Sequence, residues 1–229
     1  MNFAFAPGER PSVPIRGRGE RFPVRRIYCV GRNYPAHARE MGHNPERESP
    51  FFFAKPADAI VQNGVSVPYP SRTSDLHHEI ELVAAIAKSG SHIRPEDANE
   101  HIFGYAVGVD LTRRDLQTAA KSAGRPWETG KSFDRSAPIT AISPVADTGF
   151  VEAGRIWLSV NGAVRQEGDI ADMIWSVAET IAALSELFAL APGDLIFTGT
   201  PAGVGRLEPG DLVEGGAAGL ETLSFRIAD

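Results

Sequence analysis

Two glutamates stand two positions apart at the start of an apolar stretch, in the run His77-His78-Glu79-Ile80-Glu81-Leu82. The stretch from Ile80 to Ala87 is otherwise apolar, which predicts a buried strand. Because alternate side chains of a strand point to the same face, Glu79 and Glu81 are expected to project together. Two neighbouring carboxylates repel each other and resist burial, so a divalent cation bound through oxygen is expected between them. The alternative is an ordinary salt-bridged strand face in solvent.

A third carboxylate follows a second apolar run. Asp110 comes directly after residues 102–109, and it reaches Glu79 and Glu81 if the two runs form neighbouring strands. Three carboxylates without a set of cysteines favour a hard ion over zinc. The sequence therefore predicts a site for Mg²⁺, with Mn²⁺ or Ca²⁺ as alternatives. His77 and His78 are expected to be structural rather than ligands.

A histidine and a glutamate three positions apart are candidates for proton transfer. Asn33 is expected to cap a short helix, with Pro35 in its first turn and Gly42 at its exit. On that helix His37 and Glu40 share a face. A carboxylate beside an imidazole raises its basicity and fixes its orientation, as a general base requires. Taken alone, the pair also fits an incidental contact on a surface helix.

Further cationic and polar side chains could reach the same region. Lys55 ends the aromatic stretch 51–55 and either holds an anion or lies on the surface. Thr112 is expected to cap a helix on which Arg114 and Gln117 share a face. Both side chains could then point toward the three carboxylates, and the alternative for Arg114 is an exposed charge on the helix surface. Lys131 lies in a loop rich in turn residues, where it either stabilises developing negative charge or points into solvent.

The last third of the chain contains a predicted helix and a glycine-rich loop. Ser176 and Glu179 form a capping box, and the helix is expected to run to about Leu190. Its apolar face is expected to pack in the core and consists of Val177, Ile181, Leu184, Leu187 and Phe188. The loop 199–205 has no P-loop lysine and no following helix, which excludes a nucleotide site. Its N–H groups and the Thr200 hydroxyl are expected to hold a carboxylate, unless the loop is a plain turn.

The composition is ordinary for a soluble globular protein. The chain has 229 residues and a formal net charge of -6, which argues against nucleic-acid binding. It has no apolar run long enough to span a bilayer and no secretory apolar core before Arg26, so no membrane association is expected. The one cysteine, Cys29, cannot form an intrachain disulfide. It is expected in the core of a cytoplasmic protein.

Taken together, these segments resemble the fumarylacetoacetate hydrolase family. The resemblance runs from about Ile27 to the C-terminus and rests on several stretches, none of which is specific alone. They are Gly31-Arg32-Asn33-Tyr34 with His37 and Glu40; Lys55-Pro56; His78 with Glu79 and Glu81; Asp110 with Thr112, Arg114, Asp115 and Gln117; Pro126-Trp127 with Lys131-Ser132-Phe133-Asp134; and Phe197-Thr198-Gly199-Thr200-Pro201 with Gly203-Val204-Gly205.

The resemblance implies a β-rich α+β fold, a mixed sandwich or roll with a few short helices, forming a homodimer. Residues 26–229 would form one catalytic domain, with residues 1–25 as an irregular segment packing on it. The implied site has Mg²⁺ or Mn²⁺ on Glu79, Glu81 and Asp110, a water-activating dyad of His37 and Glu40 on a lid, and Lys131 helping at the oxyanion. Arg114, Gln117 and Thr200 would hold the 2-oxo acid.

Within the family, the residues of three stretches are similar to those of bacterial fumarylpyruvate hydrolases. These are residues 31–42, 51–56 and 112–117, and Pro35 departs from the small residue expected at its position. The implied substrate is a dicarboxylic oxo acid, cleaved by water to fumarate and pyruvate. Its second carboxylate needs a cation, for which Lys55, Arg125 and Arg32 are the candidates. The alternatives are an acylpyruvate hydrolase or oxaloacetate decarboxylase, a dienedioate isomerase (2-hydroxyhepta-2,4-diene-1,7-dioate), and a metal-stabilised binding module without catalysis.

Overall fold

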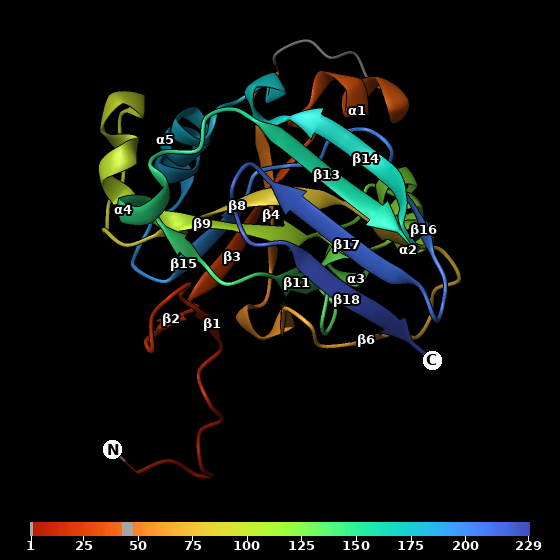
Figure 1. Cartoon of the computed structure of the whole chain (residues 1–229). Coiled ribbons are helices and arrows are strands. Elements are labelled where there is room, and N and C mark those ends of the chain that lie inside the picture. Colours follow the sequence, from red (N-terminus) through yellow and green to blue (C-terminus); the bar gives the residue numbers. More distant parts are fainter. Residues whose placement is uncertain (1, 43–47) are drawn as a thin grey trace.

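The body of the protein consists of two sheets that lie one across the other (Figure 1). The computed structural model describes residues 2–42 and 48–229. The larger sheet has the order β4 (Phe51–Lys55), β3 (Arg26–Gly31), β15 (Asp194–Phe197), β8 (Ile80–Ile86), β9 (Ile102–Val109), β11 (Ala137–Ile139) and β5 (Ile60–Gln62), and β12 (Ser143–Pro144) also pairs with β9. The smaller sheet has the order β14 (Ala163–Asp169), β13 (Arg155–Val160), β17 (Leu212–Ala217), β18 (Leu223–Ala228) and β6 (Val67–Pro68).

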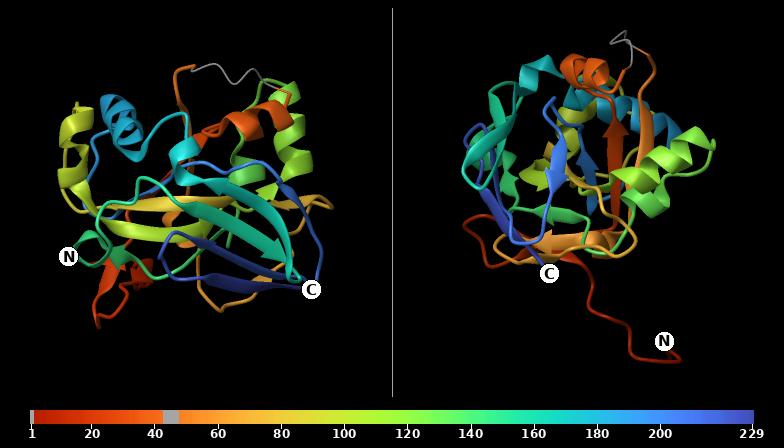
Figure 2. Two further views of the ribbon diagram at one scale, coloured as in Figure 1. Left: turned by 45° about the horizontal axis from the view of Figure 1, so that its top comes forward. Right: turned by 90° about the vertical axis from the view of Figure 1, so that its right-hand side faces the viewer.

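Short strands and helices complete the structure around these sheets (Figure 2). A three-stranded sheet contains β10 (Thr112–Arg113), β7 (Leu76–His78) and β16 (Gly205–Leu207), and β1 (Ser12–Pro14) pairs with β2 (Arg21–Pro23). The helices are α1 (Pro35–Glu40), α2 (Arg114–Ser122), α3 (Glu128–Lys131), α4 (Val145–Thr148), α5 (Val177–Leu187) and the 3₁₀ turns η1 (Ala57–Ala59), η2 (Pro95–His101) and η3 (Ile170–Asp172). The predicted β-rich fold with short helices is confirmed. No helix in the described ranges is long and apolar enough to cross a membrane.

Strand β8 lies at the centre and is buried on both faces. Its residues Ile80 and Leu82 belong to the core between the two sheets, whereas Val83 and Ala85 belong to a second core on the opposite face. This alternation follows from the two-residue period of a strand. It explains why the run is continuously apolar after Glu81, since both of its faces are covered.

The first residues of the chain add strands to the second core. Val13, Ile15 and Phe22 are buried there, next to the equally buried Cys29. The predicted core position of the cysteine is confirmed. Residues 2–10 leave the body as an exposed tail (Figure 1), so the packing begins at β1. The division of the chain into residues 1–25 and 26–229 stays a prediction.

Two of the predicted helix caps are wrong. The residue before α1 is Tyr34, which makes no side-chain cap, and the Asn33 amide instead bonds backbone groups of Trp175 and Thr198. Thr112 lies in β10, and α2 begins after Arg113. In both cases a partner far away in the sequence takes the place of the local capping bond.

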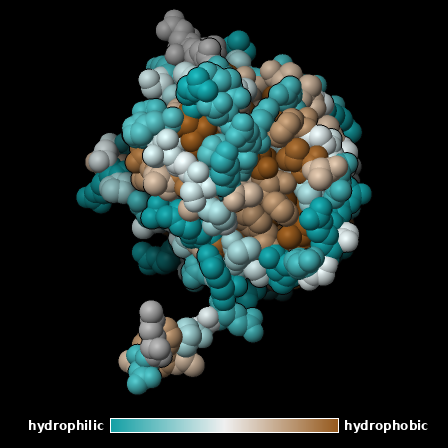
Figure 3. Space-filling view, turned by 90° about the vertical axis from the view of Figure 1, so that its left-hand side faces the viewer, coloured by the Kyte–Doolittle hydropathy of each residue, from teal (hydrophilic) through white to brown (hydrophobic). Residues whose placement is uncertain are grey.

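The capping box of α5 is confirmed, but the end of this helix is not where the sequence placed it. Ser176 and Glu179 bond reciprocally, and the helix ends at Leu187 rather than Leu190. Phe188 has an extended backbone, so its side chain leaves the face of the helix. Leu187 is 64% exposed and Phe188 41% exposed, which contradicts the predicted core packing of these two residues, whereas that of Val177, Ile181 and Leu184 is confirmed. Figure 3 shows the side of the molecule that is on the left in Figure 1, where apolar residues gather in one broad area.

The capping box makes a prediction for stability. Replacing Ser176→Ala removes the acceptor for the Glu179 N–H and should lower the free energy of unfolding by about 1 kcal/mol in urea denaturation. Ser122→Ala, at the exposed end of α2, is the matched control and should stay within about 0.5 kcal/mol of the parent. Equal effects of the two substitutions would contradict a role for the box.

Candidate active site

A cavity of about 230 Å³ is lined by residues of β3, β4, α1, α2 and α3 and of the segments beside β8 and β15. Most of the predicted site residues line it, namely Glu79, Glu81, Arg114, Gln117, Lys131 and Thr200, together with Arg32 and His37. Among the described residues, the predicted ones that do not reach its wall are Glu40, Lys55 and Asp110. The cavity therefore brings together segments from across the sequence.

The three acidic residues converge as the strand argument predicts. Strands β8 and β9 are antiparallel neighbours, and Ile80 pairs with Val109, so Glu79 and Asp110 lie side by side at the strand ends. A backbone hydrogen bond of 2.8 Å from the Asp110 N–H to the Glu79 carbonyl closes this end. One carboxylate oxygen from each of Glu79, Glu81 and Asp110 lies within 4.8 Å of the others, and all three side chains are buried.

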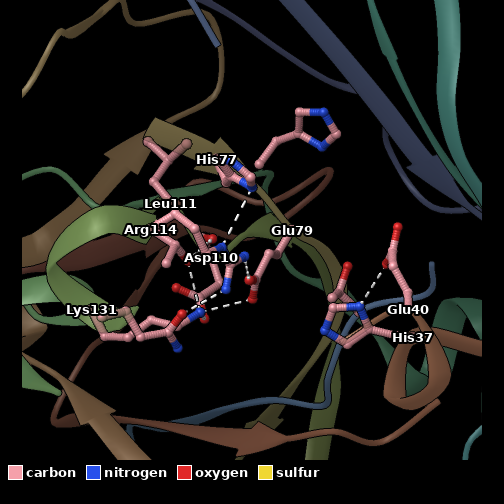
Figure 4. A network of polar contacts seen from close by, with 12 residues as sticks. His37, Glu40, His77, Glu79, Asp110, Leu111, Arg114 and Lys131 are labelled. Carbon is pink, nitrogen blue, oxygen red and sulfur yellow. Dashed lines mark hydrogen bonds and ion pairs between the residues drawn. The ribbon is translucent and has the colours of Figure 1, made fainter. Parts of the chain in front are cut away.

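Two cationic side chains, Lys131 and Arg114, lie beside the acids in Figure 4. The ammonium of Lys131 donates to Glu79 at 2.8 Å, to Asp110 at 2.6 Å and to the Thr112 hydroxyl at 2.7 Å. Its three N–H groups are therefore used by the protein. The Arg114 guanidinium bonds the other oxygen of Glu79 and also donates to the Gln117 side chain at 2.6 Å.

These neighbours push the pKa values of the two glutamates apart. Burial raises the pKa of Glu79, but the positive charges of Lys131 and Arg114 outweigh it and hold that pKa far below its usual range. Burial followed by the negative charges of Asp110 and Glu79 raises the pKa of Glu81 well above its usual range, which the single hydrogen bond from the Gly199 N–H offsets only in part. Glu81 is thus the acid whose charge is least compensated.

The donor set fits a hard divalent ion. All three ligands are carboxylates, which suit Mg²⁺ and Mn²⁺. Asp110 Oδ1 lies 2.8 Å from the Lys55 ammonium, yet it is buried and accepts no well-aligned hydrogen bond from any described residue. An ion beside Glu81 and Asp110 would satisfy both of these groups. The two histidines do not belong to this cluster, as expected: His78 bonds Gln166 and His77 bonds Asp75.

Helix α1 presents the predicted dyad at the cavity. His37 Nδ1 lies 3.1 Å from Glu40 Oε2, and His37 is 7% exposed. The other oxygen of Glu40 accepts the Gly203 N–H at 3.0 Å. A β-carbon at Gly203 would collide with the carbonyl oxygen of Arg165, so the loop approaches Glu40 only with glycine there. Part of the predicted lid, residues 43–47, lies outside the described residues.

Thr200 is held by a residue that the sequence gave no reason to select. The Gln166 amide donates to the Thr200 hydroxyl at 2.8 Å, while its oxygen accepts from the Ile80 N–H and faces His78. Gln166 is fully buried in β14, where the neighbouring residues are exposed. A polar residue inside an alternating strand carries no sequence signal for such a role, because its partners come from two other sheets.

Lys55 is not where a substrate-binding residue should be. Its side chain is fully buried, pairs with Asp110, and donates to the Leu111 and Lys131 carbonyls. It balances the charge of a predicted metal ligand from behind, and this geometry leaves it no contact with the cavity. The wall instead contains Lys121 and Trp127, neither of which was selected as a site residue from the sequence.

Comparison with known proteins shows the family of the chain. The family model of the fumarylacetoacetate (FAA) hydrolase C-terminal region matches residues 26–228. The chain belongs to the fumarylacetoacetate hydrolase family. It is 44% identical over 180 residues to a fumarylpyruvate hydrolase of Ralstonia sp, covering 79% of this chain and 93% of that relative. It is 40% identical over 201 residues to the mitochondrial oxaloacetate tautomerase of Mus musculus, covering 88% and 90%.

A solved structure gives the same picture of the fold. Fumarylpyruvate hydrolase from Pseudomonas aeruginosa, in complex with Mn²⁺ and pyruvate, superposes with a TM-score of 0.98 at 55% identity and covers 99% of each chain. The family resemblance read from the sequence is therefore confirmed. The named relatives include both fumarylpyruvate hydrolases and oxaloacetate tautomerases.

The buried acids predict how metal binding depends on pH. Because the pKa of Glu81 is raised, this carboxyl is protonated above the usual pH range of a glutamic acid, and a metal ion must displace that proton. Mn²⁺ affinity should rise with pH up to the raised pKa, with proton release detected by calorimetry in buffers of different ionisation enthalpy. Glu81→Gln should abolish the release and weaken Mn²⁺ at least about tenfold, since even groups that only orient ligands are worth that much.

Glu100→Gln is the matched control for Glu81→Gln. Glu100 is exposed on the surface, where it pairs with Lys88, and it is not a member of the acidic cluster. This variant should bind Mn²⁺ like the parent. Tight, pH-independent binding by Glu81→Gln would remove Glu81 from the ligand set.

Proposed function

We propose that the protein is a metal-dependent hydrolase that cleaves fumarylpyruvate, a dicarboxylic 2,4-dioxo acid, into fumarate and pyruvate. The observation that carries this proposal is that His37, which pairs with Glu40, lies on the wall of the cavity that also contains Glu79 and Glu81. Hydrolysis needs a base to activate water, which this dyad can supply, whereas a binding module needs no base. The likeness to fumarylpyruvate hydrolases supports the choice of substrate.

His37 acts as the base through one of its two ring nitrogens. Its Nδ1 faces Glu40, so Nδ1 carries the proton and donates it to the carboxylate. This leaves the lone pair on Nε2 to accept a proton from water. Glu40 is itself fixed by Gly203, so the imidazole keeps one orientation. The dyad resembles other catalytic pairs in which a carboxylate orients a histidine.

The reaction balances with water as the only co-reactant. The water oxygen bonds to the 4-oxo carbon while its proton moves to His37 Nε2. The bond between this carbon and the methylene carbon then breaks, and its electron pair leaves with pyruvate as the enolate. That enolate takes up a proton to give pyruvate, and the new carboxyl group completes fumarate. Each proton transfer of this kind contributes about 10²- to 10⁴-fold to the rate.

The remaining residues bind and orient the 2-oxo acid end. Mg²⁺ or Mn²⁺ held by Glu79, Glu81 and Asp110 would supply positive charge for the carboxylate and 2-oxo oxygens. Gln117 and the Thr200 hydroxyl, both on the cavity wall, hold the acid. Arg114 and Lys131 keep Glu79 ionised. The predicted oxyanion role of Lys131 would accordingly require one of its three present hydrogen bonds to be exchanged for substrate.

Related chemistries are the competing outcomes. Oxaloacetate tautomerases and decarboxylases are among the relatives at 38–40% identity, so oxaloacetate is the first alternative substrate. A dienedioate isomerase would convert its unsaturated diacid without adding water, and a ligand-binding module would not depend on the dyad. Homodimer formation and cytoplasmic localisation remain predictions.

Turnover of a substrate panel tests the proposal. Fumarylpyruvate should be hydrolysed faster than maleylpyruvate or oxaloacetate, and EDTA should abolish the reaction. His37→Ala should lower kcat about 10²- to 10⁴-fold, because it removes the base, while metal binding stays intact. His92→Ala, an exposed histidine paired with Glu186, is the matched control and should behave like the parent.

Three results would refute the proposal. One is faster turnover of oxaloacetate than of every acylpyruvate, and another is full activity after thorough removal of metal. The third is the behaviour of a binding module: the protein binds fumarylpyruvate with Mg²⁺ present but leaves it intact, and His37→Ala binds it as well as the parent does.

A further inference from the structure

The cavity has a second cationic region besides the one around the acids. Arg32 and Lys121 both line it, and neither belongs to the cluster around Glu79 and Asp110. Arg32 follows the last residue of β3, and Lys121 lies in the last turn of α2. Among the described residues no carboxylate pairs with Arg32. A buried or half-buried guanidinium without an acid is a ready partner for an anionic ligand.

Arg32 is held in place by its two neighbours in the chain. A β-carbon at Gly31 would collide with the ring of Phe51, so glycine lets this ring lie against the backbone. The guanidinium carbon of Arg32 lies 5.2 Å from the centre of the same ring. On the other side, the buried Asn33 amide bonds the Trp175 and Thr198 carbonyls at 2.8 Å and 2.7 Å. The side chain is therefore presented from a fixed turn.

The backbone of Arg32 is strained. Its φ is +57°, in the left-handed region that residues with a β-carbon rarely adopt. Such conformations persist where the surrounding structure enforces them, and they gather at functional sites. Glycine would fit this position without strain. The presence of arginine indicates that its side chain has a use at this point of the cavity wall.

An aromatic wall joins the two cationic regions. The Lys131 ammonium lies 5.0 Å from the Phe53 ring centre, and Phe53 lies 6.0 Å from Trp127. Trp127 contacts Phe51 edge-on at 5.4 Å, and the Arg32 guanidinium lies over the Phe51 ring. Phe51 and Phe53 are alternate residues of β4, about 6.6 Å apart along the strand. Arg32 therefore lies at the other end of this aromatic wall from Lys131.

Lys121 adds a second positive charge at this end. Burial, and after it the charges of Arg32 and Arg114, lower the pKa of Lys121, which shows that cations converge here. Like charges that face one cavity favour an anion between them. The two other candidates for such a role are not on the wall: Lys55 is buried behind Asp110, and Arg125 is exposed outside the described lining.

We propose that Arg32 and Lys121 form the subsite for the distal carboxylate of a dicarboxylic 2,4-dioxo acid, and that its planar acyl chain lies against the wall that Phe51 and Trp127 form together. This inference rests on the proposed hydrolase activity and specifies its substrate class. The carboxylate accepts hydrogen bonds from the Arg32 guanidinium and the Lys121 ammonium. A planar unsaturated acyl chain fits against aromatic side chains better than a bent one does. Substrates without the distal charge forgo these contacts.

The test compares fumarylpyruvate with acetylpyruvate, which has no distal carboxylate. The parent should prefer fumarylpyruvate in kcat/KM. Arg32→Gln should lower kcat/KM for fumarylpyruvate about 10- to 100-fold, mainly through KM, and leave acetylpyruvate within about twofold. Lys121→Met should act in the same direction, and Arg32→Lys should restore part of the loss. Arg155→Gln, an exposed arginine paired with Glu167, is the control and should change neither substrate.

Two further measurements keep the test independent of folding and of acetylpyruvate turnover. Inhibition by fumarate should weaken in Arg32→Gln, whereas inhibition by pyruvate should not change. Arg32→Gly should raise Tm, because glycine relieves the left-handed backbone, and should still lose the preference for fumarylpyruvate. A stabilised variant that loses this preference cannot owe the loss to misfolding.

Specific outcomes would overturn the subsite. The first is an equal loss of kcat/KM on both substrates in Arg32→Gln, and the second is unchanged fumarylpyruvate kinetics in that variant. The others are a parent enzyme with no preference for fumarylpyruvate over acetylpyruvate, and fumarate inhibition that is as strong in Arg32→Gln as in the parent. If the parent hydrolyses neither acylpyruvate, the proposed function itself fails, and that result is distinct because it appears before any substitution is made.

Discussion

The burial of three carboxylates in one place is the constraint on which this structure depends. Glu79, Glu81 and Asp110 bring their oxygens within 4.8 Å of one another inside the protein. Like charges at this distance in a poorly solvated site repel strongly, and the fold has to supply positive charge around them. Lys131, Arg114 and Lys55 do so from three different segments. Much of the chain between residues 55 and 131 is organised to bring these partners together.

Compensation in this cluster is uneven, and the unevenness is useful. Glu79 and Asp110 have direct cationic partners, whereas Glu81 receives a hydrogen bond from the Gly199 N–H. A cluster neutralised completely by lysine and arginine would have little affinity for a metal ion. One poorly compensated acid leaves a place where a divalent cation is the most favourable neighbour. The charges of Glu79 and Asp110 are thus compensated within the protein, whereas the charge of Glu81 is left for a metal ion.

The sequence predicted the parts of the site that depend on short-range periodicity. Glu79 and Glu81 share a face because of the strand period, and His37 and Glu40 meet because of the helix period. The prediction that Asp110 lies beside Glu79 and Glu81 needed one further assumption, that the two apolar runs pair as neighbouring strands. These are rules that act over a few residues, and the family resemblance supplied the order in which the pieces assemble.

What could not be predicted depends on contacts between distant segments. Asn33 looked like a helix cap, but its amide spans to Trp175 and Thr198. Lys55 was a candidate for binding substrate from the sequence, but its ammonium pairs with the buried Asp110. Gln166 gave no signal at all, because only the packing of β14 against β7 and the loop after β15 gives it partners. Local preferences carry no information on such pairings.

The two ends of the cavity are built from different parts of the molecule, and this has a consequence for evolution. The acidic end is anchored in the central strands, where every change disturbs buried charge. The end that contains Arg32 rests on a turn, a strand edge and the last turn of α2. Mutation can therefore remodel the acyl end while the acidic end is preserved. Descendants of one ancestral scaffold can diverge in substrate range in this way, as the differing activities of the relatives suggest.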